Sequence, residues 1–177
     1  MNKCVLLDRD GVLNEERGDY VYKEADFVIP ADVPSGLKAL KSAGYKLVIV
    51  TNQGGISRGL YSSDDVLALY QKLQKSCEFV IDFLLYAPIH KSISKSLASK
   101  PGRLMMERGM ALTGSDPNQS WLIGDAERDL IAGKAVGVKT ILIPTLKEQE
   151  SIYANAVCRN FGEAVELILN AGSLIRD

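Results

Sequence analysis

Short apolar runs alternate with longer amphipathic segments along most of the chain. The runs are four to six residues long and rich in Val, Ile and Leu. Such runs are typical of strands that are buried on both faces of a parallel sheet. They predict five strands, over residues 3–7, 45–50, 83–86, 120–123 and 139–143.

The segments between these strands have the period of about 3.6 residues that indicates helices. They predict five helices, over residues 34–43, 62–76, 101–112, 127–136 and 161–171. Ser62 or Ser63 can cap the second helix. Gly44 and Gly137 follow the first and fourth helices, where C-terminal glycines are common. The alternation predicts an α/β fold, a doubly wound, Rossmann-like parallel sheet with right-handed crossovers.

The length of 177 residues suits one domain, which we expect to span residues 1–177. No internal repeat, low-complexity stretch or interdomain linker interrupts the pattern. Residues 87–99 are rich in Ser and Lys without periodicity, and they predict a mobile loop. The short connections leave little room for a large cap domain, so we expect a fairly open site.

Composition narrows the classes of partner. The formal net charge is −1, so the bulk electrostatics favour neither nucleic acid nor anionic membrane. No apolar run approaches the roughly 18 residues of a membrane helix, and the first residues reach charged side chains too soon for a signal peptide. Three widely spaced cysteines argue against a disulfide framework or a CxxC zinc site. We therefore expect a cytoplasmic monomer or small homo-oligomer without nucleic-acid or membrane partners.

Polar residues stand where the predicted strands end. Asp8 follows the first strand, Thr51 the second and Asp125 the fourth. In an open parallel sheet, such positions converge on the crevice that binds ligands. Two neighbouring carboxylates are costly unless a cation compensates them, and hard oxygen ligands suit Mg²⁺. The sequence therefore predicts a magnesium site that includes Asp8 and Asp125.

A phosphate ester is the substrate that this group of residues suits. Asp8 can attack phosphorus and form an aspartyl-phosphate. Asp10, two residues further on in extended chain, lies on the same side and can act as general acid and then as general base. Lys100 would neutralise charge on the transferring group.

The phosphoryl oxygens also need hydrogen-bond donors. The Thr51 hydroxyl can supply one, and the backbone N–H groups of Asn52 and Gln53 can supply others.

Four ordered motifs resemble those of the haloacid dehalogenase-like phosphatases. They are DRDGVLN at 8–14, TNQGGISRG at 51–59, SKPGRL at 99–104 and GDAERD at 124–129. The first two look like those of the branch that includes heptose bisphosphate and histidinol phosphate phosphatases. The resemblance runs from Val5 to about Pro144.

The resemblance implies roles for individual residues. Asp8 is expected to be nucleophile and magnesium ligand, and Asp10 acid/base and a metal ligand through its carbonyl. Asp125 is expected to bind the metal, Thr51 and Asn52 to hold phosphate, and Lys100 to stabilise the phosphoryl group. The implied substrate is a small phosphorylated sugar of the heptose bisphosphate kind. Histidinol phosphate, another small phosphomonoester and a nucleic-acid 3′-phosphate are alternatives, as is a catalytically idle phosphate-binding relative.

The chain departs from that branch at two places. The heptose bisphosphate phosphatases carry a zinc loop of three cysteines and one histidine before the lysine of the third motif. Here residues 87–100 contain no cysteine and one histidine, His90, so four N/S zinc ligands are lacking and no zinc is expected. Ser99 replaces the branch's substrate-reading arginine. Both departures affect specificity rather than chemistry.

Other residues have open assignments. Glu16, Arg17 and Tyr20 match a substrate-contacting stretch loosely, and Arg58 either braces the loop after Thr51 or touches substrate. Asp129 is either a buried acid behind the metal ligands or a helix-surface residue.

Two other enzyme and signalling classes fit poorly. A receiver domain needs an aspartate after the third strand, where this chain has Tyr86, Ala87 and Pro88, and a P-loop enzyme needs a GxxxxGK[ST] motif that is absent.

Overall fold

The computed structural model describes residues 1–145 and 149–173 and contains one six-stranded sheet. Every pair of neighbouring strands is parallel. The order is β3-β2-β1-β4-β5-β6. The strands are β1 (Lys3–Leu7), β2 (Tyr45–Asn52), β3 (Phe83–Ala87), β4 (Trp121–Gly124), β5 (Lys139–Leu142) and β6 (Ala156–Val157). The predicted domain of residues 1–177 includes 146–148 and 174–177, which lie outside the described residues.

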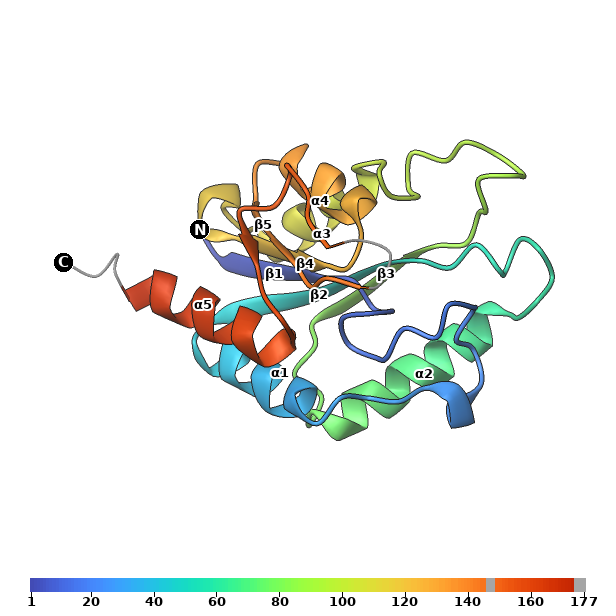
Figure 1. Ribbon diagram of the computed structural model, residues 1–177, viewed down its shortest axis with the longest axis horizontal. Helices are drawn as coiled ribbons and strands as arrows, with labels where there is room; N and C mark the ends of the chain where they lie inside the picture. The colour runs from blue at the N-terminus through green and yellow to red at the C-terminus, as the bar shows by residue number, and fades with distance from the viewer. Residues whose placement is uncertain (146–148, 174–177) are drawn as a thin grey trace.

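Helices cover both faces of the sheet (Figure 1). One face carries α1 (Asp32–Ser42), α2 (Ser63–Ser76) and α5 (Phe161–Ser173), and the other carries α3 (Leu104–Thr113) and α4 (Glu127–Lys134). Successive residues of β1 point to opposite faces. Val5 and Leu7 pack into the core beneath α1, α2 and α5, whereas Cys4 and Leu6 pack beneath α3 and α4. The prediction of a doubly wound α/β fold is therefore confirmed.

The predicted helix signals are found with small shifts. Ser62 caps α2 in a capping box with Asp65, and Gly44 and Gly137 adopt positive φ after α1 and α4. Helix α3 begins at Leu104 rather than at residue 101, because the Gly102 N–H closes a turn onto the Ser99 carbonyl oxygen. Strand β6 was not predicted, since two residues are too few to give a periodic pattern.

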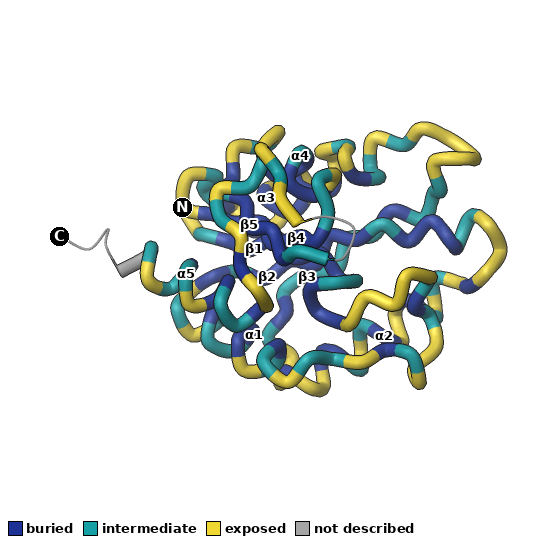
Figure 2. The backbone as a smooth tube through the Cα atoms, viewed as in Figure 1, coloured by how far each residue is buried: buried dark blue, intermediate teal, exposed yellow. Residues whose placement is uncertain are grey.

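Irregular segments join the strands to the helices at the carboxyl ends of the strands. Residues 88–103 contain neither helix nor strand. The predicted loop of residues 87–99 falls in this segment except for Ala87, which ends β3. Nothing in the described structure forms a cap over the sheet. Figure 2 shows exposed backbone in these outer loops and buried backbone in the strands. Among the described residues, no helix is both long and apolar enough to cross a membrane.

The strand order reverses its direction at β1. From β1 the chain goes outward through β2 to β3, and it then returns to the other side of β1 as β4. Leu7 of β1 lies opposite Ile123 of β4. The residues that follow these two strands therefore lie side by side at the topological switch point, where ligands bind in open α/β sheets.

Candidate active site

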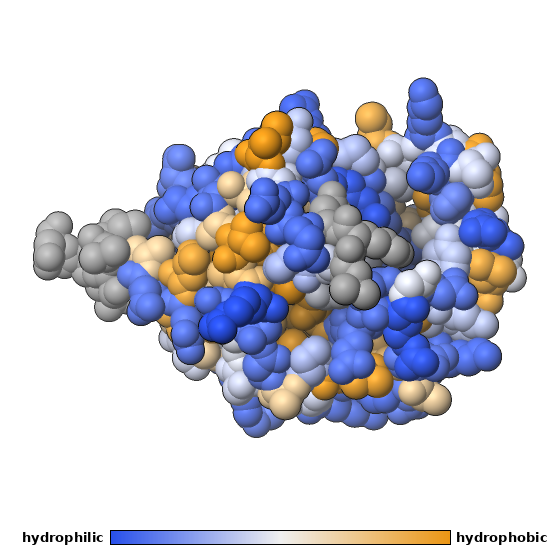
Figure 3. Space-filling view, viewed as in Figure 1, coloured by the Kyte–Doolittle hydropathy of each residue, from blue (hydrophilic) through white to orange (hydrophobic). Residues whose placement is uncertain are grey.

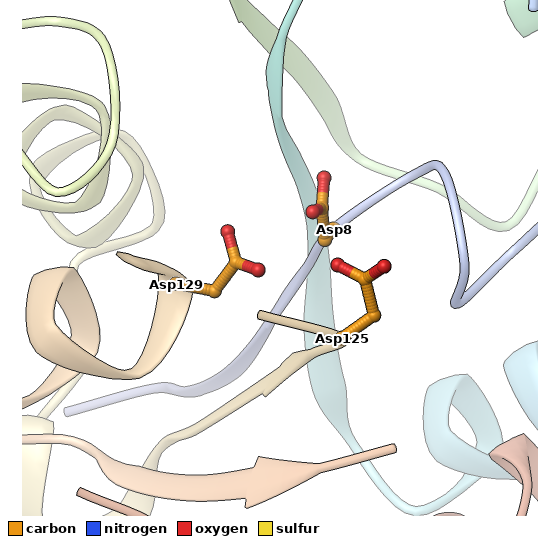
Figure 4. A group of neighbouring side chains, drawn as sticks. All are labelled: Asp8, Asp125 and Asp129. Carbon is orange, nitrogen blue, oxygen red and sulfur yellow. The ribbon is translucent and has the colours of Figure 1, made fainter. Parts of the chain in front are cut away.

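Three aspartates meet at this switch point. Asp8 follows β1, Asp125 follows β4 and Asp129 lies in the first turn of α4. The Asp8 N–H donates to the Ile123 carbonyl oxygen at 3.0 Å, which fixes the end of β1 against β4. One carboxylate oxygen from each aspartate lies within 4.8 Å of the other two. Figure 4 shows the three carboxylates gathered at the ends of these elements.

Lys100 is the cation of this cluster. Its side chain is 0% exposed, and Nζ lies 2.8 Å from Asp8 Oδ1 and 2.6 Å from Asp129 Oδ1. Nζ also donates to the Val50 carbonyl oxygen at 2.8 Å. Burial opposes the charge, but the carboxylates of Asp129 and Asp8 outweigh it and raise the pKa of Lys100. The side chain is therefore an ammonium held between two acids.

Asn52 brings Lys100 to this place. The Asn52 Nδ2 donates to the Lys100 carbonyl oxygen at 3.1 Å, and the Lys100 N–H donates to Asn52 Oδ1 at 2.9 Å. This pair of bonds ties the end of β2 to the loop before α3. The contact of the Asn52 side chain was not predicted, and its backbone role toward phosphate remains a prediction.

Asp129 is a buried acid, which settles the open alternative. It is 0% exposed, and its Oδ2 accepts a hydrogen bond from the Ala126 N–H at 3.1 Å. A Cβ on Gly124 would lie 2.4 Å from the Asp129 Cβ. A glycine at 124 therefore lets Asp129 approach Lys100.

Asp125 is suited to a cation. Its Oδ1 is buried without a hydrogen-bond partner, and burial, together with Asp8 and Asp129, raises its pKa to about 8. Gly11 has a φ of +81°, and a Cβ there would lie 2.4 Å from Asp125 Oδ2, so this turn requires glycine. Asp8 and Asp129 both contact Lys100, whereas no ion pair of Asp125 is found among the described residues. The Asp125 and Asp8 carboxylate oxygens lie within 4.8 Å of each other, and they fit a hard divalent ion.

Asp10 is held away from this cluster by three side chains. Its Oδ1 lies 2.9 Å from Arg9 Nη2 and accepts from Asn14 Nδ2 at 3.1 Å. Its Oδ2 accepts from Gln53 Nε2 at 3.2 Å. Arg9 is 3% exposed and also donates to the Val21 carbonyl oxygen at 2.7 Å. This buried arginine was missed in the sequence, although its place between two candidate aspartates was a signal.

Thr51 and Gln53 are both buried at the end of β2. The Gln53 N–H donates to the Ala87 carbonyl oxygen at 2.8 Å. It is therefore already used in sheet pairing, which corrects its predicted role as a phosphate donor. The Gln53 side chain is the part that faces the site, because Nε2 also donates to Thr51 Oγ1 at 2.9 Å.

The remaining predicted substrate-binding residues lie in two separate places. Glu16 and Arg17 line a cavity of about 750 Å³ that reaches Asp125, together with Arg128 at the start of α4. Tyr20 and Arg58 lie elsewhere and contact each other, since Arg58 Nη1 donates to the Tyr20 hydroxyl at 3.2 Å. Arg128 was not predicted.

Polar side chains of the loop before α3 form hydrogen bonds within that loop. The Ser99 hydroxyl donates to the Ile89 carbonyl oxygen at 3.0 Å. His90 Nδ1 lies 2.7 Å from the Ser92 hydroxyl in an exposed position. Cys77 and Cys158 are buried in the core on one face of the sheet, and Cys4 on the other.

The sequence is similar to those of known phosphatases. A family model described as HAD-hydrolase-like matches residues 97–164. The D-glycero-beta-D-manno-heptose-1,7-bisphosphate 7-phosphatase of Helicobacter pylori is 34% identical over 94% of this chain and 98% of its own. That of Haemophilus ducreyi is 34% identical over 96% of this chain and 93% of its own.

Solved structures share the fold. The D,D-heptose 1,7-bisphosphate phosphatase of B. bronchiseptica, complexed with magnesium and phosphate, superposes with a TM-score of 0.86 at 22% identity. It covers 96% of this chain and 99% of its own. With curated relatives above 30% identity along nearly its whole length, the chain belongs to the haloacid dehalogenase-like phosphatases, in the branch of the heptose bisphosphate phosphatases.

Proposed function

We propose that the chain hydrolyses a phosphomonoester with Asp8 as nucleophile. The contact that carries this proposal is the Asp8–Lys100 pair at 2.8 Å, at the ligand-binding edge of the sheet. Beside it, Asp125 offers a buried oxygen without a hydrogen-bond partner. A nucleophilic oxygen, a fixed ammonium and an oxygen ligand for a cation are what phosphoryl transfer requires.

Magnesium is the proposed cofactor. Asp8 and Asp125 would hold it through their carboxylates and Asp10 through its backbone carbonyl. When bound, the ion neutralises charge on the carboxylates and on the phosphoryl oxygens. Zinc is not expected, because residues 87–99 lack the cysteines of a structural site.

The contacts support the following steps for the chain's own residues. An Asp8 oxygen attacks phosphorus while the bond to the leaving oxygen breaks, and Asp10 donates a proton to that oxygen. Lys100 stabilises the phosphoryl oxygens throughout. Asp10 then removes a proton from the water that attacks the aspartyl-phosphate, which restores Asp8 and releases phosphate.

Thr51 is proposed to hold a phosphoryl oxygen. Its Oγ1 accepts a hydrogen bond from Gln53, so its own hydrogen points in another direction. That hydrogen is available as a donor to the substrate.

The proposed substrate is heptose 1,7-bisphosphate. The relatives named above carry that substrate in their names, and the cavity beside Asp125 adds Arg17 and Arg128, whose charges suit a second phosphate. On the face seen in Figure 3, the surface toward the carboxyl ends of the strands is mostly hydrophilic, as a phosphorylated sugar requires. A relative from Burkholderia mallei, 32% identical, is named for the alpha rather than the beta anomer, so both anomers belong in the test.

The direct test measures phosphate release from a panel of phosphorylated metabolites with Mg²⁺. The panel holds both heptose 1,7-bisphosphate anomers, histidinol phosphate and a 3′-phosphorylated oligonucleotide. We expect the highest kcat/KM on one heptose bisphosphate and no turnover by Asp8→Asn. Undiminished release by Asp8→Asn would refute the mechanism, whereas a different preferred substrate would refute the substrate alone.

A further inference from the structure

Tyr61 lies in the loop between β2 and α2, with its ring packed against the loop that follows β1. Its ring stacks on Tyr22 with centroids 5.2 Å apart and meets Tyr20 edge-on at 5.8 Å. A Cβ on Gly55 would lie 2.1 Å from the Tyr61 ring. The ring is therefore enclosed on three sides, and only 8% of the residue is exposed.

The Tyr61 hydroxyl starts a chain of hydrogen bonds into the site. It donates to Gln53 Oε1 at 2.8 Å. The other end of the same amide, Gln53 Nε2, donates to Thr51 Oγ1 at 2.9 Å and to Asp10 Oδ2 at 3.2 Å. Gln53 is 1% exposed, so solvent cannot replace these partners.

The orientation of the Gln53 amide follows from its partners. An ionised carboxylate only accepts hydrogen bonds, so the amide nitrogen must face Asp10. The amide oxygen then faces Tyr61, whose hydroxyl must donate. Burial raises the pKa of Tyr61 to about 12, which keeps this donor protonated at every pH at which the enzyme would be assayed.

We propose that Tyr61 is a positioning residue, which acts through the Gln53 amide to place the Asp10 carboxylate and to direct the Thr51 hydroxyl. The inference rests on the proposed acid/base role of Asp10 and goes beyond it. Without the Tyr61 hydroxyl, Gln53 Oε1 would be a buried acceptor with no donor. The amide could then rotate and turn its oxygen toward Asp10. There it would repel the ionised carboxylate and, in the protonated form, would accept the hydrogen that the leaving group needs.

The leaving group provides a readout that loss of packing would not change. A general acid matters most for a poor leaving group and least for a good one, because a good one departs without a proton. We therefore compare kcat/KM for an alkyl phosphate and for aryl phosphates of falling leaving-group pKa, ending with 4-nitrophenyl phosphate. The variant is Tyr61→Phe, and the matched control is Tyr22→Phe, which removes a hydroxyl from the ring stacked on Tyr61.

Tyr61→Phe should lose about tenfold on the alkyl phosphate and less than about twofold on 4-nitrophenyl phosphate. That loss is smaller than the 10²–10⁴-fold typical of removing a general acid or base itself. Tyr22→Phe should match the wild type on both. An equal loss on all substrates would make Tyr61 a packing residue, and no loss on any would remove it from the mechanism.

Asp10→Asn separates this inference from the proposed function. If Asp10→Asn does not lower kcat/KM more on the alkyl phosphate than on 4-nitrophenyl phosphate, the acid/base role of Asp10 fails. If Asp10→Asn does show that larger loss, and Tyr61→Phe has the wild-type dependence on the leaving group, only the role of Tyr61 fails. Should Tyr61→Phe not fold, Gln53→Met removes the same amide link and must then give the same dependence on the leaving group.

Discussion

Replacing Lys100 by methionine tests the centre of the site, because it removes one charge and keeps the length of the side chain. The ammonium is fully buried and is shared by Asp8 and Asp129 at 2.8 Å and 2.6 Å. Breaking a buried ion pair typically costs about 3–5 kcal/mol, because the remaining charge is left uncompensated. Domains are stable by only about 5–15 kcal/mol, so the loss should be large in the metal-free protein.

The loss should also depend on pH. Burial raises the pKa of the Asp129 carboxyl above its ordinary value, and Lys100 opposes this shift. Without Lys100, the pKa of Asp129 in the folded state lies further above its unfolded value. The folded state then holds protons that the unfolded state releases as pH rises above about 4. Stability must therefore fall with increasing pH in this variant. Urea unfolding in the presence of a chelator should give a smaller deficit at pH 5 than at pH 8.

Catalysis should fall in kcat rather than in KM. Removing one preorganised electrostatic stabiliser costs about 10²–10³-fold in kcat, and Lys100 acts on charge that is redistributed during transfer. Lys95→Met, in an exposed part of the loop, should change neither stability nor rate appreciably. A Lys100→Met enzyme that changed only KM, or whose stability deficit were equal at both pH values, would contradict this account.

Three further results are expected. Elemental analysis of the purified protein should find no stoichiometric zinc. One tightly held zinc per chain would contradict the prediction that residues 87–99 form no structural zinc site. Ser99→Arg should lower KM for heptose bisphosphate, because a charge-assisted contact strengthens binding by about 1–3 kcal/mol. The KM for the matching monophosphate is the reference. An unchanged KM for the bisphosphate would mean that residue 99 does not face the distal phosphate. Because the pKa of Asp125 is raised to about 8, magnesium binding at pH 7 should release a proton, and binding should tighten as pH rises through 8. Calorimetry in buffers of different ionisation enthalpy measures this release. A binding enthalpy that is the same in all buffers would contradict the prediction.

The meeting of Asp8 and Asp125 could be predicted because apolar runs fix where strands end and parallel strands end at one edge. The contacts between particular side chains were harder to predict. Arg9 is buried against Asp10, which no periodicity indicates, and Asn52 holds Lys100 from 48 residues away. Such contacts depend on rotamers chosen by packing in the folded chain.

The same limit applies to backbone donors. The Gln53 N–H looks free in a sequence, but β2 extends to Asn52 and its pairing with β3 occupies that group. Only the observed end of the strand decides this, and strand ends are the least certain part of any prediction.

The three buried carboxylates and Lys100 also fix how much charge the site can accept. With Asp8, Asp125 and Asp129 ionised and Lys100 protonated, the cluster carries three negative charges and one positive charge. One divalent ion makes it electrically neutral, whereas a monovalent ion leaves it negative and a second divalent ion makes it positive. A dianionic phosphate group therefore enters a site with no surplus of positive charge. Additional positive charge lies at the rim, where Arg17 and Arg128 line the cavity.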